Sequence, residues 1–543
     1  MDYVIVGAGS AGCVLAARLS EDPTVQVTLL EAGPPDTSVL IHCPGGLMVM
    51  ARAPTARFAH NWAFETVPQA GLNGRRGYQP RGKVLGGSSS INAMIYTRGV
   101  PRDYDAWAAE GNAGWGWADV LPVFRQSEHN ERGADAFHGA GGPLNVKDLS
   151  DPNPFSLAFV EAGVQAGYAR NTDFNGASQE GVGLYQVTHK NGERFSAAKA
   201  YLWPNRARPN LRIVTGAHAT RVLLENGRAV GVAYVQDGRE HTVRAEREVI
   251  LSAGAIQSPQ LLMLSGIGPA DHLRQHGITV RHELPGVGAN LHDHPDVVQV
   301  WDANQAHELF GLSLQGGWRM ARAVRQWRNE RRGMLTSNFA EGGAFIKTSA
   351  AEPVPDLQLH FVVGKLVSHG RATVTGHGYS CHVCVLRPRS RGSLRLASAD
   401  PLAAPLIDPA FLQDDDDTRR MVAGFKQMRA LLQQPALARF GAVERSAAAK
   451  TDAEIESFIR QNADTIYHPV GSCRMGQGGM DVVDDQLRVR GIEALRVVDA
   501  SIMPSIVGGN TNAPAIMIAE RAAALMARAP RRDNPSGKPL AAL

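Results

Sequence analysis

The first dozen residues contain the feature that most constrains this chain, a glycine-rich turn between a predicted strand and a predicted helix. Residues 3–6 (YVIV) are a β-branched and aromatic run typical of a buried strand. A full G-x-G-x-x-G follows at residues 7–12, and an apolar helical pattern comes next. A second strand over residues 25–30 ends at Glu31. This order is the one that a dinucleotide site requires, so we expect a Rossmann-type unit.

Each part of the motif has a physical reason. Gly7 permits the tight turn, Gly9 lets a pyrophosphate approach the backbone, and Gly12 lets the helix pack close to the strand. The helix N-terminus offers unpaired N–H groups to phosphate, and Glu31 can accept hydrogen bonds from ribose hydroxyls. A glycine-rich turn without a ligand is the alternative. The motif leaves NAD and FAD both open, although the tripeptide Glu-Ala-Gly that begins at Glu31 favours FAD.

Composition excludes several classes of protein. The chain has 543 residues, of which 44% are hydrophobic and 20% charged, as in globular proteins. A net charge of +4 is small for this length and gives no reason to expect nucleic acid as a partner. The five cysteines are too few for a disulfide scaffold, and the N-terminus lacks the pattern of a secretory signal. We therefore expect a cytoplasmic protein.

Four further motifs lie along the chain. They are residues 81–98 (RGKVLGGSSSINAMIYTR), 251–269 (LSAGAIQSPQLLMLSGIGP), 467–476 (YHPVGSCRMG) and 497–521 (VVDASIMPSIVGGNTNAPAIMIAER). With the N-terminal motif, and in this order, they resemble the glucose–methanol–choline (GMC) flavoprotein oxidoreductases, most of all the bacterial alcohol and choline dehydrogenases. The resemblance covers nearly the whole chain. It implies bound FAD and the oxidation of alcohols to aldehydes.

The resemblance also implies the FAD contacts, from the pyrophosphate through the ribose and the cofactor path to the flavin, adenine and ribityl chain. The pyrophosphate would contact Gly7, Gly9, Ser10, Ala11 and Gly12, and the adenosine ribose would contact Glu31 and Ala32. The cofactor path would be lined by Trp62, Arg81, Val84, Gly86, Gly87 and Ser88. The flavin ring would lie near Asn92 and Ala93, the adenine near Ala219, and the ribityl chain near Asp499 and Ala500. Some members bind FAD covalently through a histidine in the glycine–serine loop. Ile91 matches that position here, so we expect noncovalent FAD.

The same resemblance implies a catalytic pair, His468 and Asn512. A histidine titrates near neutrality, so His468 is suited to remove the hydroxyl proton of the alcohol while flavin N5 accepts the hydride. Asn512 would donate its amide N–H to the substrate oxygen. A helix predicted to start at Ala513 or Pro514 would direct its positive end towards the flavin.

The sequence therefore predicts an FAD-dependent dehydrogenase for a primary alcohol, aliphatic or aromatic, that passes electrons to a quinone or another acceptor. An alcohol oxidase that uses O2 and gives H2O2 is one alternative. A flavin-containing hydroxynitrile lyase is an alternative of another class, and an NAD-dependent enzyme is a third. The identity of the alcohol, the acceptor and the oligomeric state stay open at this point.

Three other segments invite a function. Cys381 and Cys384 form a single CxxC on a predicted strand, and one such pair is weak evidence for a metal, so we expect no metal site. Residues 315–332 carry arginines and tryptophans at helical spacing. They predict an amphipathic helix on the substrate domain or, alternatively, a peripheral contact with the inner membrane. Residues 414–417 are four aspartates, which we interpret as a solvated loop.

The expected fold class is α/β (α+β), with a Rossmann-type FAD-binding domain and a substrate domain. The FAD-binding domain is predicted to be discontinuous, over residues 1–150, 205–300 and 480–530. Residues 151–204 and 301–479 would form the substrate domain, and the resemblance implies a six-stranded antiparallel sheet with helices there. Residues 531–543 are interpreted as a tail.

Overall fold

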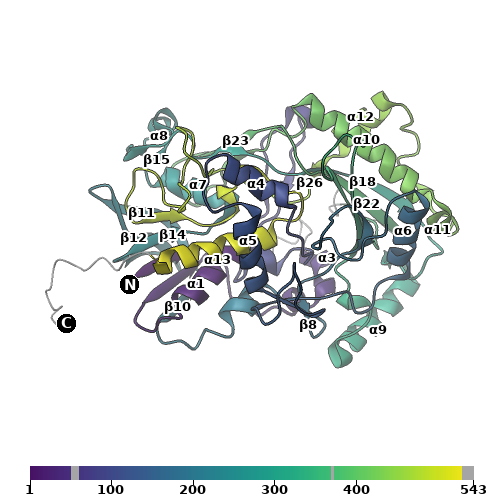
Figure 1. Cartoon of the computed structure of the whole chain (residues 1–543), viewed down its shortest axis with the longest axis horizontal. Coiled ribbons are helices and arrows are strands. Elements are labelled where there is room, and N and C mark those ends of the chain that lie inside the picture. The colour runs from purple at the N-terminus through teal and green to yellow at the C-terminus, as the bar shows by residue number, and fades with distance from the viewer. Residues whose placement is uncertain (51–59, 368–371, 373, 529–543) are drawn as a thin grey trace.

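The computed structural model describes residues 1–50, 60–367, 372 and 374–528 of the chain. The predicted tail lies outside the described residues. Figure 1 shows elements of a parallel sheet on one side of the molecule and elements of an antiparallel sheet on the other. The mixed α/β architecture with a Rossmann-type sheet is confirmed.

The parallel sheet has the strand order β10-β2-β1-β14-β27. Its strands are Leu211–Thr215, Val27–Glu31, Tyr3–Val6, Glu248–Leu251 and Leu495–Val497 in that order, so three distant parts of the chain build it. The three central strands are almost entirely buried, as both faces of a parallel sheet usually are. The predicted first strand is found with the bounds expected. The second starts two residues later than expected and includes Glu31.

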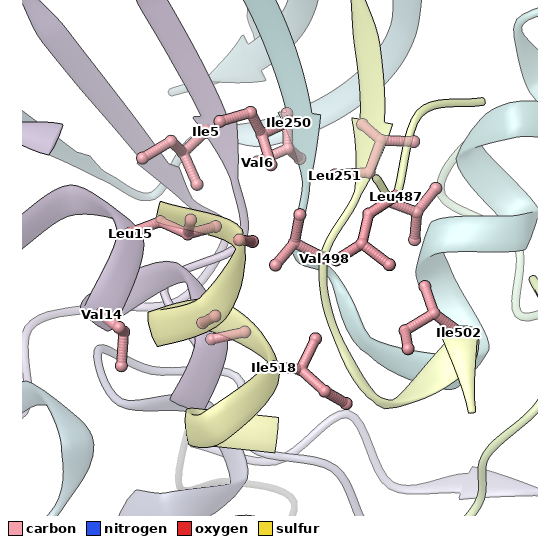
Figure 2. Close-up of a cluster of buried hydrophobic side chains, with 14 of the residues drawn as sticks. Ile5, Val6, Val14, Leu15, Ile250, Leu251, Leu487, Val498, Ile502 and Ile518 are labelled. Carbon is pink, nitrogen blue, oxygen red and sulfur yellow. The ribbon is translucent and has the colours of Figure 1, made fainter. Parts of the chain in front are cut away.

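Two helices from opposite ends of the chain pack on one face of this sheet. They are α1 (Ser10–Leu19) and α13 (Asn512–Arg528), and Figure 2 shows Leu15 and Ile518 from them in the same cluster as Ile5 and Ile250 of the sheet. Gly12 makes the close approach of α1 possible, because a Cβ there would lie 1.9 Å from the carbonyl oxygen of Gly7. The first turn of α1 is thereby held at the end of β1.

The antiparallel sheet follows the order β25-β18-β22-β21-β20-β7, with β19 beside β22 and β26 beside β18. These strands are, in order, Val443–Glu444, Pro295–Asp302, Gly376–Val385, Leu357–Val362, Ala340–Ile346, Gly181–Leu184, Gly311–Leu312 and Asp464–Thr465. The predicted six-stranded path is present, and two short strands extend it to eight. β18 begins before residue 300, where a domain boundary was predicted; the domain limits themselves stay a prediction.

Helices α6 (Pro154–Gln165) and α10 (Asp415–Leu432) pack against the antiparallel sheet. The interpretation of residues 414–417 as a solvated loop was wrong. Asp414 caps the N-terminus of α10, where a carboxylate is favourable. Asp417 is fully buried and accepts hydrogen bonds from the backbone N–H groups of Arg389 and Ser390, at 2.7 and 2.9 Å. Within the part of the chain that the structure describes, no helix is both long and apolar enough to span a bilayer.

Candidate active site

One cavity of about 400 Å³ lies between the two sheets. On one side it reaches Val6, Leu30 and Ser252, at the carboxyl ends of the central parallel strands. On the other side it reaches His360 and Val362 of β21. Ligands of open parallel sheets bind outside the carboxyl ends of the strands, so the cavity lies where a dinucleotide is expected.

The end of the cavity at β2 is built for a nucleotide. The Glu31 carboxylate accepts hydrogen bonds from the backbone N–H groups of Ala8 and Gly33, at 2.9 and 2.8 Å. Burial raises the pKa of Glu31 to about 7. No side chain caps the N-terminus of α1 at Gly9, which leaves its first N–H groups free to bind an anion such as a pyrophosphate.

The middle of the cavity is held together by Asp499. Its carboxylate accepts from the hydroxyl of Ser258 at 2.6 Å and from the backbone N–H of Gly254 at 2.9 Å. Burial raises the pKa of Asp499. Ser252 also lines the cavity, and its buried hydroxyl has no hydrogen-bond partner within the described part of the chain. A bound polar group would satisfy this hydroxyl, since buried polar atoms are normally paired.

The glycine–serine loop closes over the N-terminal motif. Gly87 lies so close to Gly9 that a Cβ on it would come within 2.7 Å of the Gly9 Cα, and its φ of +52° also favours glycine. Arg194, which the sequence analysis did not single out, holds this loop. Its guanidinium donates to the carbonyl and the side-chain oxygen of Asn92, at 2.7 and 2.8 Å. The two glycine motifs thus form one cradle.

Most of the predicted FAD contacts line the cavity. They are Gly7, Gly9, Ser10, Ala11, Glu31, Ala32, Trp62, Arg81, Gly87, Ser88, Asn92, Ala93, Ala219, Asp499 and Ala500. Three others lie behind the wall. Gly12 allows helix packing, Val84 packs against Ile41 and Met50, and the backbone N–H of Gly86 donates to Ala8 at 2.8 Å. These three support the cradle and do not face the space inside it.

His468 lines the same cavity as Glu31 and is buried. Its backbone N–H donates to the carboxylate of Asp293 at 2.8 Å, and Arg81 donates to the carbonyl of the preceding residue, Tyr467, at 2.7 Å. Burial holds the pKa of His468 well below its usual range, and His294, His360 and Arg81 lower it further. The imidazole is therefore neutral at neutral pH and can accept a proton.

A chain of hydrogen bonds fixes which nitrogen of His468 carries the proton. The Nε2 of His294 lies 3.0 Å from the carbonyl oxygen of Leu386, which can only accept, so this Nε2 must carry the hydrogen. Burial lowers the pKa of His294 to about 3, so the ring is neutral and its Nδ1 is an acceptor. That Nδ1 lies 3.1 Å from Nδ1 of His468, which must then donate. The lone pair of His468 is left on Nε2.

The residue that faces Nε2 of His468 is Asn510, at 3.2 Å from its Nδ2. The side-chain oxygen of Asn510 accepts from Gln358 at 3.1 Å and from Thr97 at 3.2 Å, which orients the amide with Nδ2 towards the histidine. The partner predicted for His468 was Asn512. The structure places Asn512 at the first position of α13, where its side-chain oxygen accepts from the Ser10 hydroxyl at 2.7 Å.

A second histidine in the cavity was missed by the sequence analysis. His360 on β21 is buried, lines the cavity, and has no hydrogen-bond partner on either ring nitrogen among the residues that the structure describes. Burial and the neighbouring His382 and His294 hold its pKa well below the usual range. A neutral imidazole has one donor and one acceptor, so His360 offers both to a ligand. A lone histidine on an apolar strand gives no local signal of this role.

The charged groups of the cavity wall already have partners in the protein. In the described part of the wall, the carboxylates are those of Glu31 and Asp499, and both accept hydrogen bonds from the protein. Of the cations, Lys365 is ion-paired with Asp302 at 2.8 Å, and Arg81 donates to the carbonyl of Tyr467 at 2.7 Å. The described wall therefore offers no free carboxylate to a cationic ligand.

Among the described residues no group of three or more His, Cys, Asp or Glu side chains is arranged to hold a metal ion. Cys381 and Cys384 lie on β22 and are both fully buried thiols. Burial raises the pKa of each thiol well above its usual value, which disfavours the thiolate that a metal would need. The expectation of no metal stays a prediction.

A glycine motif at the end of a parallel sheet, joined by one cavity to a buried histidine, is the arrangement expected of a dinucleotide-dependent oxidoreductase. Models of the GMC oxidoreductase family match residues 1–296 and 388–519. The chain belongs to this family. Membership makes it an FAD-dependent enzyme that oxidises alcohol-type substrates.

Several known proteins are similar along nearly their whole length. An alcohol dehydrogenase [acceptor] of Pseudomonas putida is 50% identical, covering 97% of this chain and 96% of that protein. The mitochondrial choline dehydrogenase of Homo sapiens is 45% identical, covering 99% and 92%. Among solved structures, pyridoxine 4-oxidase from Mesorbium loti has a TM-score of 0.86 at 33% identity, covering 98% of this chain and 100% of that one.

Proposed function

We propose that this protein oxidises an uncharged primary alcohol to an aldehyde with noncovalent FAD and passes the electrons to a quinone or a similar acceptor. The observation that carries the proposal is the arrangement of His468 and Asn510. The lone pair of His468 Nε2 and an amide N–H of Asn510 meet at the end of a cavity that begins at the dinucleotide motif.

The residues of the cavity fit FAD along its length. Glu31 would accept from the adenosine ribose, the N-terminus of α1 would bind the pyrophosphate, and the free hydroxyl of Ser252 would find a partner. When bound, FAD supplies the acceptor for the hydride. Ile91 lines the cavity wall and offers no nucleophile for a covalent bond, which supports noncovalent binding.

His468 performs the proton step. Its neutral Nε2 accepts the hydroxyl proton of the alcohol, and the resulting imidazolium keeps its Nδ1–H bond to His294. Asn510 carries two amide hydrogens, so it can donate one to the substrate oxygen and stabilise the negative charge that develops there. His360 would hold the substrate through its unpaired nitrogens.

One of the similar proteins is named for choline, a cationic alcohol, whereas the charges of the cavity wall favour an uncharged one. A quaternary ammonium such as choline is bound by carboxylates or by several aromatic faces. Here the carboxylates in the described wall, Glu31 and Asp499, already accept hydrogen bonds from the protein, and Arg81 lies close enough to His468 to lower its pKa. The similarity to choline dehydrogenase therefore does not extend to choline as the favoured substrate.

The test is anaerobic reduction of the purified yellow holoenzyme by a panel of alcohols. We expect 1-octanol and benzyl alcohol to bleach the flavin and choline to leave it oxidised at the same concentration. Reoxidation by a soluble quinone without peroxide supports a dehydrogenase, whereas rapid reoxidation by O2 with stoichiometric peroxide supports an oxidase. A flavin that no alcohol bleaches, in an enzyme that cleaves a cyanohydrin, would overturn the proposal in favour of a lyase.

Acid precipitation tests the mode of FAD binding separately. Noncovalent FAD leaves a colourless protein pellet and a yellow supernatant. Yellow colour that stays with the pellet would contradict this part of the proposal and leave the alcohol chemistry untouched.

A further inference from the structure

The helix α9 (Leu314–Glu330) rests on the rest of the protein along a narrow strip. Of its side chains, Ala323 and Trp327 are buried, and the Trp327 indole N–H donates to the carbonyl of Gly192 at 2.8 Å. Figure 1 shows α9 at the outer edge of the molecule, below the antiparallel sheet. Most of the helix surface therefore faces solvent.

Large apolar side chains are exposed at the start of this helix. Leu314 is 94% exposed and Trp318 is 77% exposed, and Leu312, just before the helix, is 51% exposed. Leu314 and Trp318 are four residues apart and so lie on one face. Single exposed apolar residues are common in proteins, but a leucine and a tryptophan side by side on an unpaired helix face indicate a contact with an apolar partner.

The same helix carries cations without counter-charges. In the described structure, Arg322, Arg325 and Arg328 form no ion pair and no side-chain hydrogen bond, whereas Arg331 pairs with Glu193 at 3.3 Å. Arg325 lies seven residues from Trp318 and therefore on the same outward face. The helix contains one acidic residue, at its last position. Its exposed surface is thus both basic and apolar.

We propose that the outward face of α9, with Leu312 before it, docks on the surface of an anionic lipid bilayer. Arginines bind lipid phosphates, and tryptophan and leucine side chains enter the boundary between headgroups and acyl chains. A second copy of this chain would bring like charges together. A nucleic acid would satisfy the arginines and leave Leu314 in water. An anionic bilayer offers phosphates to the arginines and an apolar interior to Leu314 and Trp318.

The docking surface is connected to the catalytic cavity. The chain leaves α9 through the short helix η6 (Met334–Thr336) and then supplies Asn338 and Phe339 to the cavity wall. Docking through α9 would keep this part of the cavity near the bilayer, where apolar alcohols and quinones dissolve. The docking itself does not depend on which alcohol or acceptor the enzyme uses, so its test is independent of the proposed function.

The experiment is co-sedimentation of the holoenzyme with vesicles of phosphatidylcholine alone and of phosphatidylcholine with phosphatidylglycerol at 3:1. We expect binding to the anionic vesicles at low salt, loss of binding at high salt, and little binding to phosphatidylcholine. Each arginine near an anionic surface strengthens binding roughly fivefold. The double variant Arg322→Glu/Arg325→Glu should therefore weaken binding by more than about 25-fold, because it also adds repulsive charges.

The matched control is Arg212→Glu/Arg239→Glu, with the same charge change at exposed positions on β10 and on β13 (Arg239–Arg244). It should bind like the wild type. The variant Leu314→Ser/Trp318→Ser should also lose binding while its flavin content and flavin reduction by alcohol stay unchanged. The proposal would be overturned if both charge variants bound equally well, if binding did not depend on lipid charge, or if no binding occurred at low salt. A dimer that the α9 variants dissociate, without vesicle binding, would overturn it in favour of a second copy.

Discussion

Replacing His294 by leucine removes the acceptor that keeps the proton of His468 on Nδ1. In the wild type the carbonyl of Leu386 accepts from His294 at 3.0 Å, and His294 accepts from His468 at 3.1 Å. Without His294, the ring of His468 can place its proton on Nε2, where it blocks the lone pair that must receive the substrate proton. The variant should therefore bind FAD normally and react slowly.

The size of the effect follows from the hydrogen bond that is lost. A buried bond between neutral groups contributes about 0.5–1.5 kcal/mol net, which corresponds to a roughly 2- to 13-fold slower reduction. Complete transfer of the His468 proton from Nδ1 to Nε2 would slow reduction far more. A catalytic histidine held in the wrong tautomer lowers kcat by about 10⁴-fold. We expect His294→Leu to lie between these limits.

The control is His294→Gln. The nitrogen and oxygen of an amide are separated by one carbon, as are the two ring nitrogens, so glutamine can donate to Leu386 and accept from His468 in the same directions. The assay is stopped-flow flavin reduction by saturating alcohol without oxygen, with flavin content measured for each variant. Glutamine should restore much of the rate. Wild-type reduction by His294→Leu, or equal losses in both variants, would refute the tautomer argument.

Three further predictions follow from the same geometry. Asn510→Ala should slow flavin reduction roughly 10²- to 10³-fold, which is the usual effect of losing a donor to a developing oxyanion. Asn512→Ala should mainly weaken the contact with Ser10. Equal rate losses in the two variants would contradict the assignment of Asn510 as the donor. Because burial lowers the pKa of His468, reduction should stay constant from pH 8 down to about pH 6, and an acid limb centred above pH 7 would contradict this. His360→Ala should raise KM roughly 2- to 13-fold through a lost hydrogen bond, and an unchanged KM would exclude a substrate contact.

The local parts of the fold were predictable from the sequence because their signals are local. The strand before Gly7, the glycine turn and the helix after it form one short unit whose residue types have direct conformational reasons. A helix over residues 315–332 was predicted from its periodicity in the same way, and the structure has it over residues 314–330. In contrast, the aspartates at 414–417 were misread, because their role as a helix cap depends on the helix that follows.

The choice between Asn510 and Asn512 shows what the sequence alone could not decide. Asn510 and Asn512 lie two residues apart in one motif, and either amide could face the histidine. The choice is made by the start of α13, which turns Asn512 towards Ser10, 502 residues away in the chain. The roles of His294 and His360 were not predicted, for a related reason. Their roles arise from the pairing of distant strands, and nothing in their immediate neighbours distinguishes them from histidines of an ordinary core.

The central claim is that His468 removes the proton of the alcohol, and the most direct measurement is the rate of anaerobic flavin bleaching in His468→Ala. General base catalysis contributes roughly 10²- to 10⁴-fold, so the variant should retain its yellow FAD and be reduced by alcohol slower by that factor. The rate should also rise with pH as solvent hydroxide replaces the missing base. A variant with full FAD content that is bleached at nearly the wild-type rate would contradict the account.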